Sequence, residues 1–115
     1  METTTATPEI TFDDFVKVDI RVGTITTAER VPKSKKLIKL QVDFGEFGTR
    51  QIVAGIGETF EDHELPSAKI MAVVNLAPRK LMGIESHGMI LASADKNGRL
   101  CLAKCSDVSN GSKVG

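Results

Sequence analysis

Two clusters of basic side chains are the residues of this chain best suited to chemistry, and that chemistry is phosphate binding. The first cluster contains no acid; its members are Arg30, Lys33, Lys35, Lys36 and Lys39. The second is the pair Arg79 and Lys80, directly after Pro78. Ammonium and guanidinium groups bind phosphate oxygens through charge-assisted hydrogen bonds. A solvated, lysine-rich turn is the alternative interpretation of the first cluster.

The net charge of the chain does not reveal these clusters, because 15 lysine and arginine residues balance 15 acidic residues. A globally positive field, which steers many proteins onto nucleic acid, is therefore absent. The acids gather elsewhere, in the N-terminal segment and between Glu58 and Glu64. Any binding of nucleic acid must depend on this segregation of charge.

Aromatic side chains are scarce, with five phenylalanines and no tryptophan or tyrosine among 115 residues. Proteins that bind single-stranded nucleic acid stack the bases on exposed rings, each worth roughly 1–3 kcal/mol. We expect the phenylalanines to lie mostly in the core, which disfavours that mode of binding. A folded RNA can instead be held at its phosphates and 2′-hydroxyls by Lys, Arg, Asn and Ser side chains.

No group of residues typical of catalysis is present in the sequence. Asp13 and Asp14 are adjacent, so their carboxylates point apart and do not form an acid–base pair. Cys101 and Cys105 have no neighbouring histidine to activate a thiol, and with two distant histidines they are a poor zinc site. We expect a binding module with no enzymatic activity, no cofactor and no metal.

Length and composition predict one soluble domain. A chain of 115 residues accommodates a single core. We expect residues 1–10 to form a flexible segment and residues 11–115 the domain. No apolar run approaches the roughly 18–20 residues of a membrane helix, and the start of the chain lacks the features of a secretory signal. With only two cysteines, this favours the cytoplasm and no membrane contact.

Short stretches rich in β-branched residues, separated by glycine and charge, predict five or six strands. These stretches are 19–29, 37–44, 49–56, 69–76, 88–93 and 100–103. Within 37–44, successive side chains largely alternate between apolar and polar, as in a half-buried strand. Gly23 interrupts the first stretch and indicates a bulge or a sharp bend.

Two short helices are expected beside the strands. Thr11 or Asp13 can cap a turn over residues 11–18. An acidic helix over residues 58–65 is predicted to end before Pro66. Strands that do not alternate with helices predict an all-β fold. The best match is the five-stranded Greek-key barrel called the OB-fold, here with a short inserted helix and a short N-terminal helix.

Four stretches of the sequence resemble one known family. They are 12–23 (FDDFVKVDIRVG), 34–37 (SKKL), 53–56 (VAGI) and 75–92 (NLAPRKLMGIESHGMILA), of which the last is the most specific. This family is the tRNA-binding domain found at the C-terminus of many methionyl-tRNA synthetases and as a free-standing, beta-subunit-like protein. The resemblance covers roughly residues 10–115. It implies an OB-fold that binds tRNA by shape, and a homodimer, because the free-standing members usually are homodimers.

The resemblance also implies a set of tRNA-binding residues. They are Lys36, Asn75, Arg79, Lys80, Ser86 and Met89. Many members have an acid where this chain has Lys35, so the main phosphate contact is open between Lys35 and Lys36. The chemistry of the residues themselves adds Lys33, from the basic cluster, and Met82, in a predicted loop.

Several of these residues have a purely structural alternative. Asn75 can cap a turn, and Ser86 can make a local hydrogen bond. Met89 can belong to the core, while Arg79 and Lys80 can be ordinary surface charges. Binding and structural roles both stay open for them on the sequence alone.

Export chaperones of the CsaA type offer a second interpretation. They are similar to this chain in sequence and fold, and they bind unfolded or signal-bearing polypeptides through apolar surface. Residues 34–37 and 86–89 match the tRNA-binding branch better. We therefore expect a non-catalytic, structure-specific tRNA-binding homodimer that acts alone or assists methionyl-tRNA synthetase in trans.

Overall fold

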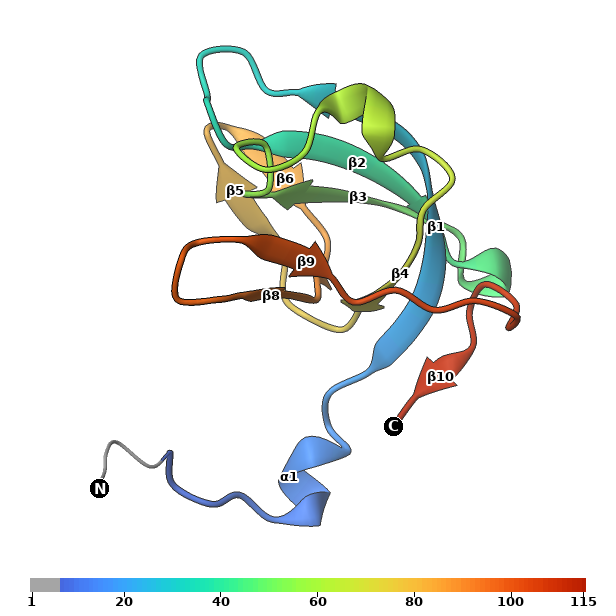
Figure 1. The fold of residues 1–115 in the computed structure, drawn as a ribbon. Coiled ribbons are helices and arrows are strands. Elements are labelled where there is room, and N and C mark those ends of the chain that lie inside the picture. Colours follow the sequence, from blue (N-terminus) through green and yellow to red (C-terminus); the bar gives the residue numbers. More distant parts are fainter. Residues whose placement is uncertain (1–6) are drawn as a thin grey trace.

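The strands wrap into a nearly closed, barrel-like sheet in the computed structural model, which describes residues 7–115 (Figure 1). Five of them are β1 (Ile20–Arg30), β2 (Ile38–Asp43), β3 (Thr49–Ala54), β4 (Lys69–Val73) and β7 (Met89–Ile90). Their order is β3-β2-β1-β4-β7, and all neighbouring pairs are antiparallel. A further strand, β10 (Lys113–Val114), pairs with the start of β1. The expected OB-like, all-β fold is confirmed.

Strand β1 bends the sheet because its two halves have different neighbours. Its first half pairs with β4 and its second half with β2. The register with β2 shifts between Ile25 and Thr27, which marks a bulge and increases the local bend. Gly23 lies just before this bulge, and its lack of a side chain matters for packing. A Cβ at Gly23 would come within 2.6 Å of the Phe44 ring, so glycine allows this ring to pack against β1.

The core lies inside the barrel and is built mainly from β1 to β4. In β2 every second residue is buried, as the alternation predicts. The largest fully buried side chains of these strands and their ends are Val22, Ile25, Ile38, Leu40, Val42, Phe44, Ile52 and Ile70. Burying such side chains contributes about 1.5–3 kcal/mol each, so the barrel is a firm support for its loops.

We had expected most of the five phenylalanines in the core, but three of them lie outside it. Phe44 is buried and Phe60 partly buried, but Phe12, Phe15 and Phe47 are 77%, 40% and 47% exposed. Phe12 and Phe15 bound α1 (Phe12–Phe15), the expected N-terminal turn, which extends away from the barrel (Figure 1). Helix α1 begins with a capping box between Thr11 and Asp14 and buries none of its residues.

The helix expected over residues 58–65 is reduced to one 3-10 turn, η2 (Asp62–Glu64). The Ile56 carbonyl first accepts two N–H groups in a separate turn. A new turn then begins at Glu61, whose N–H donates to the Glu64 carboxylate at 2.7 Å. Pro66 follows too soon for a longer helix to form.

Two further hairpins complete the architecture. One joins β5 (Arg79–Leu81) to β6 (Ile84–Ser86), and the other joins β8 (Ala92–Ala94) to β9 (Leu100–Leu102). A 3-10 turn, η1 (Gly45–Phe47), connects β2 to β3. The β5–β6 hairpin was not expected from the sequence. Its turn is Met82-Gly83, with φ of 50° and 80°, and methionine is unusual where Asn-Gly or Asp-Gly is the typical signal.

The N-terminal segment expected over residues 1–10 is only partly described. Residues 1–6 lie outside the described residues, and residues 7–10 are exposed and outside any helix or strand. No helix within residues 7–115 is long and apolar enough to cross a membrane.

Candidate nucleic-acid interface

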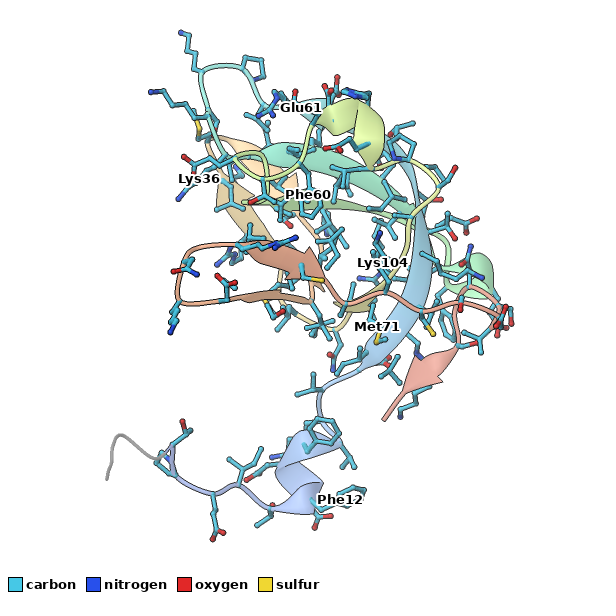
Figure 2. The ribbon with its side chains drawn as sticks, in the orientation of Figure 1. Phe12, Lys36, Phe60, Glu61, Met71 and Lys104 are labelled. Carbon is cyan, nitrogen blue, oxygen red and sulfur yellow. The ribbon has the colours of Figure 1, made fainter. Side chains whose placement is uncertain are left out.

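Residues 31–37, between β1 and β2, form an exposed loop that we call the lysine loop. Its exposed lysines are Lys33, Lys35 and Lys36. The loop is closed at its base, where the Val31 N–H donates to the Leu37 carbonyl at 3.0 Å. The Leu37 N–H in turn donates to the Ser34 hydroxyl at 3.0 Å. Because Val31 and Leu37 are buried, the loop is anchored while its lysines remain in solvent, as Lys36 shows in Figure 2.

The β5–β6 hairpin packs beside this loop. Leu81 and Ile84, which face each other across the hairpin, pack against a buried cluster. That cluster consists of Val31, Leu37 and Val53. The packing places the β5–β6 hairpin, whose first strand carries Arg79 and Lys80, against the base of the lysine loop. We call the lysine loop and the β5–β6 hairpin together the basic face.

Arg79 and Lys80 point to opposite sides of the hairpin. Arg79 pairs with Ser86, which is 3% exposed and lies against β3. Lys80 pairs with Glu85 on the outer side, where both residues are exposed. The sequence neighbours therefore have different electrostatic surroundings, because a carboxylate stands opposite Lys80 alone.

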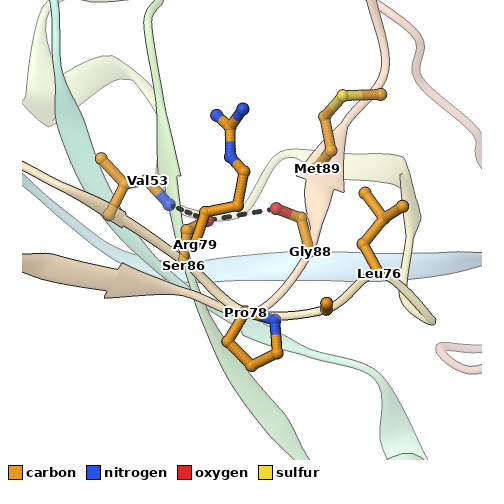
Figure 3. Close-up of a pocket in the computed structure, with 8 residues that line it drawn as sticks. Val53, Leu76, Pro78, Arg79, Ser86, Gly88 and Met89 are labelled. Atoms are coloured by element: carbon orange, nitrogen blue, oxygen red, sulfur yellow. Dashed lines mark hydrogen bonds between the residues drawn. The ribbon is translucent and has the colours of Figure 1, made fainter.

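A pocket of about 440 Å³ lies where Arg79 meets the barrel (Figure 3). Its lining residues are Val53, Leu76, Ala77, Pro78, Arg79, Ser86, Gly88 and Met89. Leu76 and Met89 are 45% and 50% exposed. The pocket thus combines one guanidinium group with an accessible apolar wall. Leu76 and Pro78 were not among the site residues predicted from the sequence. The proline was a usable signal, because proline is rare inside a sheet and here indicates that the chain has left it.

Two predicted site residues have their polar groups engaged within the protein. The Ser86 hydroxyl accepts the Val53 N–H at 2.9 Å and donates to the Gly88 carbonyl at 3.1 Å, shown as dashed lines in Figure 3. Asn75 accepts the Asp19 N–H at 2.8 Å and donates to the Lys17 carbonyl at 2.6 Å. Ser86 therefore ties the hairpin to β3, and Asn75 holds the segment that leads into β1.

The two methionines of the predicted site are both exposed. Met82 is 57% exposed at the tip of the β5–β6 hairpin, and Met89 is 50% exposed at the pocket. Met89 is thus outside the core, which was the structural alternative for this residue. Their flexible thioethers are suited to contact with an irregular apolar or ring surface.

Two members of the first basic cluster do not belong to the basic face. Lys39 lies on β2 with its Nζ 2.7 Å from the Glu29 carboxylate. The Arg30 guanidinium is turned toward the protein and donates to the Gly57 carbonyl at 2.8 Å. The structure therefore brings together Lys33, Lys35 and Lys36 with the hairpin, and engages the other two basic residues internally.

The chain is similar to several known proteins. Residues 20–113 match the family model described as "Putative tRNA binding domain". The chain belongs to this tRNA-binding domain family. It is 59% identical over 86 residues to the methionine–tRNA ligase of Methanococcoides burtonii, a match that covers 75% of the chain and 13% of the ligase. The tRNA-binding domain thus spans about an eighth of that relative, and it is homologous to the C-terminal domain of methionyl-tRNA synthetase.

Two solved structures are similar to this tRNA-binding domain over nearly its full length. The MetRS-related protein of Pyrococcus horikoshii has a TM-score of 0.89 and 37% identity, covering 95% of this chain and 100% of its own. The chaperone CsaA of Bacillus anthracis has a TM-score of 0.85 and 33% identity, covering 94% and 100%. The domain is therefore related to both branches that its sequence resembles.

Proposed function

We propose that this tRNA-binding domain is a non-catalytic module that holds folded tRNA by its phosphate backbone and shape. The observation that carries the proposal is the basic face, where a loop with three exposed lysines packs against the hairpin that carries Arg79 and its pocket. Phosphate contacts position a protein on RNA without reading its sequence. Within residues 7–115 no exposed phenylalanine lies on the basic face. Phe12, for example, lies at the far end of the molecule from Lys36 (Figure 2).

The proposed active form is a homodimer. Five apolar side chains at the N-terminal end are exposed, by 37–77%. They are Ile10, Phe12, Phe15, Val16 and Val18, which we call the N-terminal apolar segment. Exposed apolar side chains gathered in one short segment are typical of an interaction site. A second copy is the occupant that the free-standing members of the family suggest, and it would present two basic faces to one tRNA.

The proposed setting is the cytoplasm, with the domain acting alone or in trans to methionyl-tRNA synthetase. Cys101 and Cys105 are both free thiols, which suits a reducing compartment. Relatedness to methionine–tRNA ligases supports the synthetase as partner. A module that holds tRNA near the enzyme would raise its local concentration without taking part in the chemistry.

Binding of unfolded polypeptides is the second candidate function. It is favoured by the apolar wall of the pocket, with Leu76 and Met89 half exposed, and by the similarity to the chaperone CsaA. The two candidates differ in salt dependence, because apolar contacts release no condensed counterions.

Binding of unfractionated tRNA across a salt series tests the proposal. We expect the logarithm of the association constant to fall linearly with the logarithm of salt concentration, with about 0.7–0.9 in slope for each phosphate contact. An unstructured RNA of equal length should bind more weakly. If tRNA fails to bind at low salt while an unfolded peptide binds, the chaperone candidate replaces this one. Equal affinity for both RNAs would contradict recognition by shape.

The opposite orientations of Arg79 and Lys80 lead to a matched pair of variants. Arg79→Ala should weaken tRNA binding about tenfold, as expected for the loss of one well-placed guanidinium–phosphate contact. Lys80→Ala should weaken it only about twofold, because Lys80 points away from the side of Arg79 and has Glu85 in the cross-strand position. Filter binding at fixed salt measures both. Equal losses would show that the hairpin's two sides contribute alike.

A further inference from the structure

Arg30, the last residue of β1, connects two loops through its guanidinium. Nη2 contacts three groups in the turn over residues 57–61. They are the carbonyls of Gly57 (2.8 Å) and Phe60 (3.2 Å) and the carboxylate of Glu61 (3.3 Å). Nη1 donates to the carbonyl of Lys35 at 3.4 Å. One side chain therefore joins the lysine loop to this turn. Figure 2 labels Lys36 of the loop and Phe60 and Glu61 of the turn.

Gly57 holds the next residue of the loop from the same side. Its N–H donates to the Lys36 carbonyl at 2.7 Å. A Cβ on Gly57 would stand 2.8 Å from Nη1 of Arg30 and 2.9 Å from the Lys36 carbonyl oxygen. Both distances are shorter than real Cβ contacts allow, so any larger residue would push the loop or the guanidinium away. The absence of a side chain at position 57 is thus part of the same arrangement.

We propose that Arg30 and Gly57 form a clamp that positions the lysine loop for RNA, an inference that rests on the proposed tRNA-binding function. Arg30 is a positioning residue, since its donors are directed to protein acceptors. Its effect on tRNA passes through the backbone of Lys35 and Lys36. Lysine side chains are long and flexible, so a backbone that is already fixed lowers the entropy lost when they engage phosphates.

Limited trypsin digestion of the full chain tests the clamp without RNA. In Arg30→Lys, which keeps the charge but loses the forked donor geometry, and in Gly57→Ala, cleavage after Lys35 and Lys36 should accelerate about fivefold or more, because local opening exposes the loop. Gly55→Ala is the matched control, since a Cβ there meets only Lys36 Cδ at 4.0 Å. Cleavage after Lys104, on another part of the surface, should stay unchanged in all variants and reports global unfolding.

Binding of tRNA by the same variants tests the consequence. Arg30→Lys and Gly57→Ala should each weaken tRNA binding about fivefold, with net charge unchanged, while Gly55→Ala should bind like the parent chain. Removing the three loop lysines should cost less affinity in the Gly57→Ala background than in the parent, because a displaced loop has already lost part of its contacts. A role confined to stability would leave this coupling at zero.

The two measurements separate the possible failures. Unchanged cleavage after Lys35 and Lys36 would overturn the clamp itself. Faster cleavage with unchanged tRNA affinity would overturn the positioning role and leave the proposed function standing. If the parent chain binds no tRNA, the proposed function and the positioning role both fail, while digestion still decides whether the clamp holds the loop.

Discussion

Replacing Lys33, Lys35 and Lys36 together by alanine is expected to lower tRNA affinity by about 30- to 100-fold at moderate salt, because up to three phosphate contacts are lost. The slope of the salt dependence should also decrease in magnitude by about 2–3, since each lost contact removes about 0.7–0.9. All three side chains are exposed, so the fold should be retained. Filter binding across a salt series, with thermal unfolding as the check on folding, measures both effects.

A matched variant removes three other lysines from different parts of the surface. Lys96, Lys104 and Lys113 are also exposed, and their replacement by alanine changes the net charge by the same amount. If binding depended only on total charge, the two triple variants would bind tRNA equally weakly. We expect the control to lose less than about threefold, because exposed charges beyond the Debye length of about 8–10 Å are screened.

The second large effect is expected at the N-terminal apolar segment. Phe12→Ser with Phe15→Ser should convert a dimer into a monomer at micromolar concentration, since burying a phenylalanine contributes about 1.5–3 kcal/mol and each dimer would lose four rings. The affinity for tRNA should fall about tenfold or more when two basic faces no longer act together. Light scattering gives the oligomeric state, and binding at the same protein concentration gives the affinity.

Neither ring supports the described fold of a single copy, because α1 buries none of its residues. Both should therefore be replaceable without a change in unfolding temperature. Val108→Ser provides the control, since Val108 is another exposed apolar residue, at 41%, near the opposite end of the sequence. A parent chain that is monomeric at micromolar concentration, or a double variant that remains dimeric, would refute the dimer proposed here.

Much of the fold could be predicted because its signals are local. The apolar alternation in β2 matches the burial of every second residue, since side chains in a strand point alternately to opposite faces. Thr11 and Asp14 form a capping box within four residues of chain. Such patterns depend on neighbours in sequence, so they can be read before the tertiary structure is known.

The predictions that were wrong or missing concern contacts and packing in the folded chain, which local sequence patterns do not reveal. The acidic stretch over 58–65 has helical character but holds only one 3-10 turn, because a separate turn ends at Phe60 and Pro66 follows soon after Glu61. The β5–β6 hairpin was missed because its turn lacks a typical residue pair, while its stability comes from packing on Val31 and Leu37. The phenylalanines were expected mostly in the core, but Phe12 is largely exposed in the described chain.

The sequence by itself determined the family, the strand-rich barrel and the two basic clusters, because residue types and their order carry those properties directly. Only the tertiary structure decided which charges can meet an RNA. Contacts between distant residues direct Arg30 inward, pair Lys39 with Glu29 and separate Arg79 from Lys80. A charge counts for binding only where its hydrogen-bonding groups remain free and point outward, and the three-dimensional packing determines both conditions.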